Sequence, residues 1–460
     1  MIELMDRILE KLEKGSKYGE VRYMSGEGTQ SSMRNSEFQG EATSSGEGIA
    51  VRALNESIGM GFISSFDLGK IEEVVDKVLR NSHRNGRNGL FTSGGVKDRW
   101  DALGKHKVED IQSSDRIELM KSIDEMMKSH SLSVRINAIY HRKSKQIYQN
   151  TSGSLIESKF SRIGYFMVGG YKDGNSFEEI YRQFGTTGGM DNFKDLNVYQ
   201  KIEDTVKNLK EISASPSAKP GRYDVVISPE IAGIVAHESC GHPTEWDRIS
   251  GREGSLAGES FLTGKKYPYK IGSPVVSVID DPTIKGSYGY YKYDDEGIKA
   301  RKRYLYRNGM TDEFIHSRES ASNYGVEPNG GGRASDWDME PLARMSTTYI
   351  EPGDQTFEEL IEDVKNGIYI KTYTEWNIDD IRFNEKYVGS EAFLIENGKL
   401  KGRVRKPAIE TTTVNFYSSI DAVSNELEFS AGTCGKGDPE QGVETWMGGP
   451  SVRLRNIYIS

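Results

Sequence analysis

Alternation of apolar and polar residues, interrupted by tight-turn signals, is the sequence feature that most limits the folds open to this chain. It runs from Leu132 to Tyr171 and returns in SVRLRNIYI, residues 451–459. Asn308-Gly309 and Asn397-Gly398 each separate two strand-like segments, and Asn-Gly is the strongest local signal for a two-residue hairpin turn. Alternation with a period of two and short turns predicts antiparallel strands that have one buried face.

Helical periodicity is confined to shorter segments between these strands. Apolar residues recur at helical spacing at 2–12, 71–79, 113–130, 195–213 and 356–367. In the last segment we expect Thr356 to cap the helix, Glu359 to complete a capping box and Gly367 to end it. Runs of strands mixed with a few helices favour an α+β class, with mostly antiparallel sheets, over a doubly wound fold.

The segment SASPSAKPG, residues 213–221, is the best candidate for a domain boundary. Its small residues and prolines separate a helical pattern from the strand-like YDVVIS. A chain of 460 residues is long enough for two large domains. We therefore expect an N-terminal α+β domain at 1–215, with a role in a cleft or in dimer contacts. The C-terminal domain at 216–460 would contain the short apolar helix that follows Pro229.

Charge and cysteine content exclude several classes of protein. Sixty Lys and Arg against 69 Asp and Glu give a formal charge of −9, which argues against a broad nucleic-acid or anionic-membrane surface. No apolar stretch approaches the roughly 18–20 residues of a membrane span, and the N-terminus lacks the apolar region of a signal peptide. Cys240 and Cys434 are too few for a disulfide framework. We expect a cytoplasmic protein.

The segment His237-Glu238-Ser239-Cys240-Gly241-His242 is the strongest candidate for chemistry. It resembles the HExxH motif of zinc peptidases with one additional residue between the histidines. On a regular α-helix, residues five apart point about 140° away from each other, too far for two ligands of one tetrahedral ion. A positive φ at Gly241, with Pro243 preventing continuation of the helix, would let His242 turn back toward His237.

A third ligand and a base complete the expected site. A catalytic zinc ordinarily has three protein ligands and one water. Cys434, in the glycine-flanked TCGKG segment, is the expected third ligand, and Cys240 is the alternative. Glu238 would accept the proton of the water. Lys436 is either a contact to a substrate carboxylate or an ordinary loop cation. Alone, HExxxH also arises by chance, and Cys434 is also typical of a structural cysteine.

Two other segments admit a binding role, although a simpler interpretation is the default for each. Glu327–Arg333 includes three consecutive glycines that would cradle an anion, but a glycine-rich surface loop is the expected reading. Asp294-Asp295-Glu296-Gly297 has the carboxylates of a hard-cation site, but an acidic turn is expected.

Several motifs together resemble the TldD/PmbA family of metallopeptidases, and specifically its catalytic TldD-type subunit. They are HESCGHPTE from His237, YDDEG from Tyr293, RM at Arg344 with PGD shortly after it, and TCGKG from Thr433. The resemblance covers most of the chain and is densest from about 220 to 450. It implies one zinc ion per catalytic subunit, held by His237, His242 and Cys434, with Glu238 as the base. Arg344 and Lys436 are the expected substrate contacts.

The resemblance also implies an activity and partners. The expected activity is zinc-dependent hydrolysis of short or unfolded peptides by a metal-activated water. The expected assembly is a dimer, with a TldE/PmbA-type subunit or with a second copy. The alternative is a non-catalytic partner or scaffold whose metal site is structural, although such a site needs no base at Glu238. A cysteine-nucleophile hydrolase using Cys434 or Cys240 is a weaker alternative, which chelation and zinc restoration would distinguish.

Overall fold

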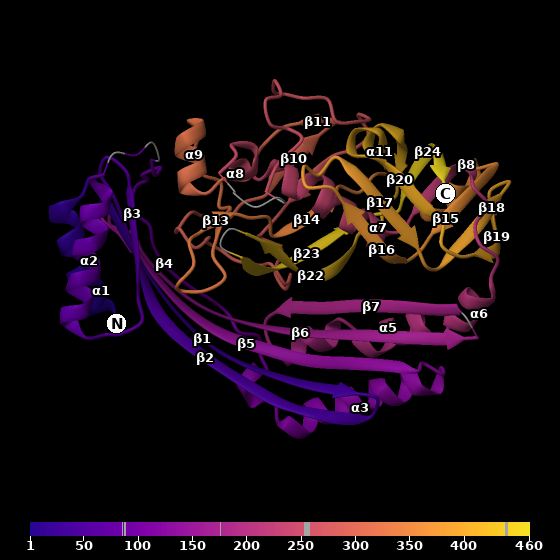
Figure 1. Cartoon of the computed structure of the whole chain (residues 1–460), viewed down its shortest axis with the longest axis horizontal. Coiled ribbons are helices and arrows are strands. Elements are labelled where there is room, and N and C mark those ends of the chain that lie inside the picture. The colour runs from indigo at the N-terminus through magenta and orange to yellow at the C-terminus, as the bar shows by residue number, and fades with distance from the viewer. Residues whose placement is uncertain (85, 87–88, 175, 253–257, 438–439) are drawn as a thin grey trace.

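The computed structural model describes residues 1–84, 86, 89–174, 176–252, 258–437 and 440–460. In these residues the strands form sheets of seven, six, two and nine strands, most of them antiparallel, with a few short helices (Figure 1). The predicted α+β class is therefore confirmed. Within the described part of the chain, no helix is both long and apolar enough to cross a membrane.

The seven-stranded sheet contains every strand before residue 188. Its order is β3-β2-β1-β5-β6-β4, with β7 paired to β6, and only the β4–β6 pair is parallel. The strands are β1 (Tyr18–Arg34), β2 (Glu37–Leu54), β3 (Ile58–Ile63), β4 (Lys97–Ala102), β5 (Val134–Asn150), β6 (Leu155–Asp173) and β7 (Ser176–Thr187). The long strands β1, β2, β5 and β6 curve beneath the C-terminal half of the molecule (Figure 1).

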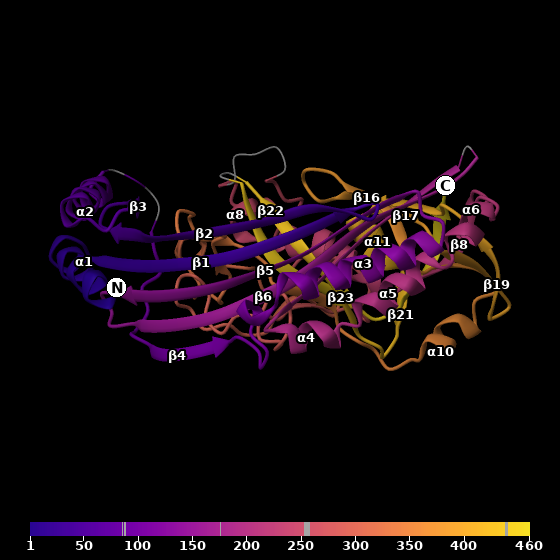
Figure 2. The ribbon, with the colours of Figure 1, turned by 90° about the horizontal axis from the view of Figure 1, so that it is seen from below.

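Helices cover the two ends of this sheet with separate cores. At one end, Met5, Ile8 and Leu12 of α1 (Ile2–Gly15) pack with Val75 and Val78 of α2 (Leu68–Ser82) against β1–β3. At the other end, α3 (Ser113–Ser129), α5 (Val198–Val206) and α6 (Leu209–Ala214) pack against β5–β7. Figure 2 shows the two groups at opposite ends of the long strands. The helical spacing predicted near 195–213 corresponds to α5 and α6.

The C-terminal half places a buried helix against two sheets. The nine-stranded sheet has the order β16-β17-β20-β24-β8-β15-β18-β19, with β21 on β24, and the six-stranded sheet has the order β11-β10-β9-β14-β23-β22. Helix α7 (Pro229–Ala236) packs its apolar side chains into the core that both sheets share. The strands are β8 (Gly221–Ile227), β9 (Val278–Asp280), β10 (Arg303–Arg307), β11 (Met310–Thr311), β14 (Thr347–Ile350), β15 (Asn366–Ile370), β16 (Tyr373–Ile378), β17 (Asn384–Gly389), β18 (Ala392–Glu396), β19 (Lys399–Val404), β20 (Ala408–Thr412), β21 (Ile420–Val423), β22 (Glu428–Lys436), β23 (Gln441–Gly449) and β24 (Val452–Ile459).

The remaining elements of the C-terminal half are short. Strands β12 (Gly332–Arg333) and β13 (Leu342–Ala343) form the two-stranded sheet. The short helices of this half are α8 (Trp246–Ile249), α9 (Arg318–Tyr324), α10 (Phe357–Glu362) and α11 (Thr413–Ser419), whereas α4 (Met190–Asp195) belongs to the N-terminal half. The chain passes from the seven-stranded sheet to the others between α6 and β8, within the segment 213–221 that the sequence marked as a boundary.

The local turn predictions have mixed outcomes. Both Asn-Gly hairpins are confirmed, because Asn308 and Asn397 have φ of 50° and the glycines after them have φ of 74° and 73°. Thr356 caps α10 as expected. The expected stop at Gly367 is wrong, because α10 ends at Glu362 and Gly367 lies inside β15. A Cβ there would lie 2.5 Å from the backbone oxygen of Asp224 on the neighbouring strand, so close strand packing explains the glycine.

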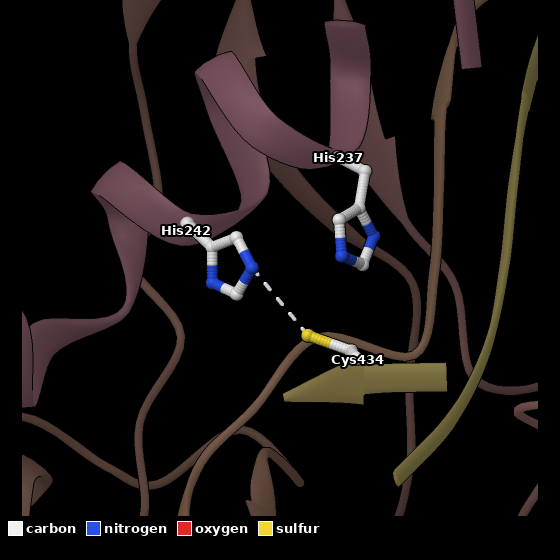
Figure 3. A group of neighbouring side chains, drawn as sticks. All are labelled: His237, His242 and Cys434. Atoms are coloured by element: carbon white, nitrogen blue, oxygen red, sulfur yellow. Dashed lines mark hydrogen bonds between the residues drawn. The ribbon is translucent and has the colours of Figure 1, made fainter. Parts of the chain in front are cut away.

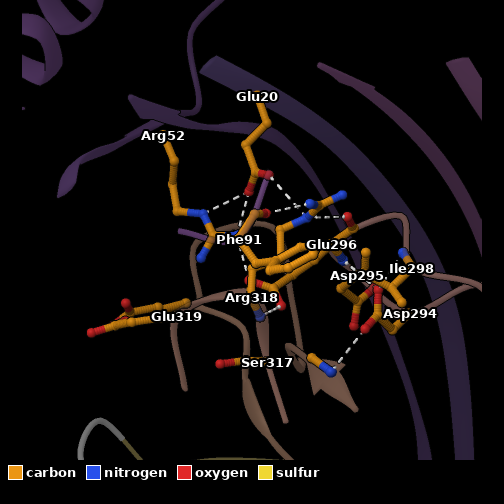
Figure 4. A network of polar contacts seen from close by, with 12 residues as sticks. Glu20, Arg52, Phe91, Asp294, Asp295, Glu296, Ile298, Ser317, Arg318 and Glu319 are labelled. Atoms are coloured by element: carbon orange, nitrogen blue, oxygen red, sulfur yellow. Dashed lines mark hydrogen bonds and ion pairs between the residues drawn. The ribbon is translucent and has the colours of Figure 1, made fainter. Parts of the chain in front are cut away.

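A buried network of charges joins the two halves of the molecule (Figure 4). Arg52 of β2 donates to Glu20 of β1 (Nε–Oε1, 2.6 Å) and to Glu296 of the C-terminal half. The other carboxylate oxygen of Glu296 accepts the backbone N–H of Arg318 (2.6 Å), whose side chain donates to Phe91 O (2.7 Å). Glu20, Arg52, Glu296 and Arg318 are all buried. The Arg52–Glu296 contact thus places a buried ion pair across the interface of the two halves.

The acidic turn at 294–297 and the glycine-rich segment at 327–333 both pack at this network. The side chain of Asp294 accepts three backbone N–H groups, so it stabilises a turn. Burial, and then the neighbouring Glu296, raise the pKa of Asp294 to about 8. The glycine-rich segment is not a surface loop, because 329–334 are buried. A Cβ on Gly332 would lie 2.2 Å from the Glu296 carboxylate, so this glycine permits close approach to the network.

Replacing Glu296 by Ala is expected to lower the free energy of unfolding by about 3–5 kcal/mol. The change removes one of the two buried carboxylates that Arg52 contacts, and it leaves the Arg318 backbone N–H without its acceptor. Urea unfolding followed by fluorescence measures the loss. Arg307→Ala, which removes an exposed ion pair with Asp312, is the control and should have a much smaller effect. A Glu296→Ala protein as stable as the Arg307→Ala protein would contradict the stabilising role of the network.

Candidate metal centre

The histidine-bearing helix begins as an ordinary capped helix. The Ser228 side chain accepts the backbone N–H of Ile231, and Pro229 occupies the first turn, where its missing N–H is not needed. The apolar residues of α7 are buried, which fixes the helix in the core. After Ala236 the chain continues as a π-helical turn (His237–Gly241) and then a 3-10 turn (His242–Thr244).

The π-helical turn explains how histidines five residues apart share one side of the helix. The backbone N–H of His242 bonds to the C=O of His237, five residues back, so the two residues lie one above the other. The expected reversal at Gly241 is wrong, because this residue has helical φ of −56° and ψ of −62°. Its lack of a side chain matters instead, since a Cβ would lie 2.3 Å from Met345 Sδ.

His237, His242 and Cys434 meet in a buried triad (Figure 3). Their ligand atoms all lie within 4.8 Å of one another, and Cys434 Sγ is 3.4 Å from His242 Nε2. A tetrahedral zinc ion with a Zn–S bond of about 2.3 Å and a Zn–N bond of about 2.1 Å would hold such atoms roughly 3.6 Å apart. Two imidazoles and one thiolate are a donor set that zinc takes, so the triad fits this metal.

The charge state of Cys434 suits metal binding. Burial opposes ionisation of the Cys434 thiol, but His242, Arg344 and His237 together hold its pKa well below the ordinary value. Cys240, by contrast, lies fully buried in the core, and burial raises its pKa well above the ordinary value. The structure therefore brings Cys434, and not the alternative Cys240, to the histidines. A thiolate at this position is the form that coordinates a metal.

Glu245 connects the two segments that present the triad. Its Oε2 accepts hydrogen bonds from His242 Nδ1 (3.1 Å), Arg248 Nε (2.8 Å) and Lys436 Nζ (3.2 Å). A carboxylate on the second ring nitrogen of a metal-ligating histidine fixes its tautomer and orientation. Glu245 therefore orients His242 and, through Lys436, also holds the strand that carries Cys434.

The two expected substrate contacts lie behind the triad. Lys436 is buried, and its ammonium donates to Asp247 (2.6 Å) and to Ala343 O (2.8 Å) as well as to Glu245. Arg344 is fully buried and donates to the backbone oxygen of Cys434. Neither residue lines the adjoining cavity. The structure thus places both where they support the ligand-bearing strand, and neither in the lining of the cavity.

A cavity of about 960 Å³ opens directly onto the triad. Its walls include parts of β7, β16 and β22, each of which lies at an edge of its sheet. Tyr181 and Trp376 line it and are 51% and 37% exposed, so aromatic surface is available to a ligand. Glu238 also lines the cavity, and its Oε2 accepts a hydrogen bond from Arg382 Nη1 (3.1 Å). Sequence reasoning missed Arg382, which follows Glu238 by 144 residues and belongs to no motif.

Comparison with known families matches almost the entire chain. Family models of PmbA/TldA metallopeptidases match it in three parts, domain 1 at 19–82, the central domain at 106–212 and the C-terminal domain at 220–460. The chain is 31% identical over 458 residues to "Metalloprotease MJ0996" of Methanocaldococcus jannaschii, covering 97% of both chains. It is 24% identical over 424 residues to "Zinc metalloprotease TldD homolog" of Saccharolobus solfataricus, covering 90% of both.

Solved structures share the fold over the full length. TldE from Thermococcus kodakarensis superimposes with a TM-score of 0.75 at 20% identity, covering 99% of this chain and 100% of that one. A putative modulator of a DNA gyrase from Thermotoga maritima gives a TM-score of 0.79 at 18% identity and full coverage of both chains. At such identities the likeness establishes the fold alone.

Proposed function

Because the chain belongs to the PmbA/TldD family of metallopeptidases, we propose that it is a zinc-dependent peptidase that hydrolyses short or unfolded peptides. The observation that most supports this is the buried triad of His237, His242 and Cys434, with Glu238 beside it in the wall of one cavity. A non-catalytic scaffold with a structural metal site would not need a carboxylate facing the cavity.

The proposed chemistry assigns a task to each residue. His237, His242 and Cys434 would hold the zinc ion, which supplies polarisation of a carbonyl oxygen and a lowered pKa of a bound water. Glu238 takes a proton from the attacking water, whose oxygen bonds to the carbonyl carbon. Glu238 then gives the proton to the amide nitrogen as the C–N bond breaks, which releases an acid and an amine. Glu245 keeps His242 oriented throughout.

The cavity supports the proposed preference for unfolded peptides. An extended peptide is able to pair its backbone with an exposed strand edge, which gives affinity with little selection among side chains. Strands β7, β16 and β22 each offer part of an edge to the cavity. A folded domain would first have to unfold locally or globally, at a cost of roughly 5–15 kcal/mol for a whole domain.

Assembly and location belong to the same proposal. We propose a dimer, with a TldE/PmbA-type subunit or with a second copy of the chain. The shared fold with TldE from Thermococcus kodakarensis agrees with this pairing. We also propose a cytoplasmic location, since a reducing compartment keeps Cys434 free as a thiolate ligand.

We expect the zinc-loaded protein to cut a destabilised, unfolded variant of a small domain at least tenfold faster than the stable parent domain. A chelator should abolish cleavage, and added zinc should restore it. Gel analysis of both substrates at equal concentration, beside metal analysis, measures these effects. Equal rates for the two substrates would contradict a sequestered site. Zinc binding without any cleavage would favour the scaffold alternative, and cleavage that survives chelation would favour a cysteine nucleophile.

A further inference from the structure

Arg382 contacts the proposed base directly. Its Nη1 donates to Glu238 Oε2 at 3.1 Å, and the two side chains are only 13% and 6% exposed. Both residues line the cavity at the triad. A guanidinium has five N–H donors in a planar fork, so one bond to Glu238 leaves most of its donors for other acceptors.

The backbone around Arg382 is held in an uncommon conformation. Arg382 has φ of 62°, in the left-handed region that residues other than glycine seldom adopt. Its N–H donates to Asp379 O (2.9 Å), and its carbonyl accepts the Thr413 hydroxyl (2.9 Å). The adjacent Ile381 carbonyl accepts the N–H of Phe261 (2.7 Å). Strained residues held from several sides are concentrated at active sites and ligand clamps.

The guanidinium also has a donor without an acceptor. In the part of the chain that the structure describes, Arg382 Nε is buried and has no hydrogen-bond partner. Two other cations at the cavity lie near acids other than Glu238, since Arg182 lies 3.4 Å from Glu230 and Lys371 lies 2.9 Å from Glu391. A buried donor without an acceptor is costly, so the protein holds the guanidinium here at a cost. Because Arg382 lines the cavity and makes one bond to Glu238 through Nη1, the remaining Nη donors are the ones that a ligand oxygen would meet.

We propose that Arg382 is a further catalytic residue, which donates hydrogen bonds to the carbonyl oxygen of the peptide bond being cut. This role rests on the proposed peptidase function. As the water oxygen bonds to the carbonyl carbon, the π electron pair of the C=O bond moves to oxygen, and the guanidinium stabilises that negative charge. The pair returns when the C–N bond breaks and the proton from Glu238 reaches nitrogen. The bond to Glu238 keeps base and donor at a fixed separation.

The test compares Arg382→Gln and Arg382→Lys with the parent protein. Gln removes the charge and the fork, whereas Lys keeps the charge, and Arg307→Gln at an exposed ion pair is the matched control. Peptide hydrolysis gives kcat and KM, metal analysis gives zinc content, and calorimetry gives the affinity for a phosphinic peptide that mimics the tetrahedral transition state.

We expect Arg382→Gln to lower kcat by about 10²–10³-fold, as loss of one donor to an oxyanion does, with KM and zinc content near the parent values. Affinity for the phosphinic peptide should fall by a similar factor. The phosphinate has the negative charge of the transition state, whereas the carbonyl oxygen of an uncleaved substrate is neutral. Arg382→Lys should recover part of both losses, and Arg307→Gln should match the parent.

Other outcomes overturn the proposal. A change confined to KM would make Arg382 a binding residue only, and loss of zinc from both Arg382 variants would make it structural. If the parent protein cuts peptides and the Arg382→Gln variant cuts them equally well, the role of Arg382 is refuted while the proposed peptidase function stands. A parent protein that holds zinc but cuts no peptide would refute the proposed function, and this role with it.

Discussion

Replacing Glu238 by Gln is expected to lower peptide turnover by about 10²–10⁴-fold and to leave one zinc ion bound per chain. The amide has nearly the shape of the carboxylate but cannot take the proton from the attacking water. Glu238 is not one of the three grouped ligand residues, so the metal should remain. Steady-state hydrolysis of an unstructured peptide, with metal analysis of the same preparation, measures both quantities.

A matched control separates this effect from a general loss of negative charge. Glu410→Gln removes an exposed carboxylate on β20 that faces Lys386, outside the cavity, and should cut peptides at the parent rate. Turnover by Glu238→Gln within threefold of the parent, with full zinc, would show that another group accepts the proton.

Replacing Cys434 by Ala is expected to lower zinc affinity by more than about 100-fold. Loss of a residue that only hydrogen-bonds to a metal ligand typically lowers affinity by about 10–100-fold. The variant loses a ligand itself, and the two remaining imidazoles are fewer than the three protein ligands usual at a catalytic zinc. Competition with a chromophoric chelator measures the dissociation constant, and activity at low free zinc should fall with occupancy.

Cys240 provides a control of the same chemical kind. Its thiol is fully buried in the core and lies outside the grouped ligands, so Cys240→Ala should bind zinc as the parent does. If Cys434→Ala holds a full equivalent of zinc as firmly as the parent while Cys240→Ala releases it, the assignment of the ligand cysteine is reversed.

The sequence predicted correctly those turns and helix ends that depend on the conformations and hydrogen bonds of neighbouring residues. Asn308-Gly309 and Asn397-Gly398 formed hairpins because both residues of such turns require positive φ. Thr356 formed a cap because its hydroxyl satisfies a free backbone N–H at the helix start. The adjacency of Glu238 to His237 is likewise a local feature. Cys434 lies 192 residues beyond His242, so no spacing rule reaches it, and its assignment depended on the resemblance.

Features determined by tertiary contact were not predictable from the sequence. Gly241 ends the π-helical turn with its backbone close against Met345, a tertiary contact that no helix propensity reports. Gly367 resembled a helix stop, but its neighbour across the sheet explains it. Lys436 resembled a substrate contact because a motif indicates that a residue matters without indicating whether it faces the cavity or the protein interior. Arg382 gave no signal, since a single arginine beside two aspartates has no distinctive pattern.

Two hydrogen bonds hold β7, one wall of the cavity, to the strands on the opposite side. Gln183 of β7 donates to Thr433 (3.1 Å), and Trp446 donates to Gly185 O (2.8 Å), so this wall is tied to the strands beside the triad. The buried Arg52–Glu296 contact ties the far end of the same sheet. Hinged opening of the halves would break these bonds and expose buried charge. Under the proposed function, we therefore expect a peptide to thread into the cavity without separation of the halves, so that the thickness of the chain rather than its residues would limit entry.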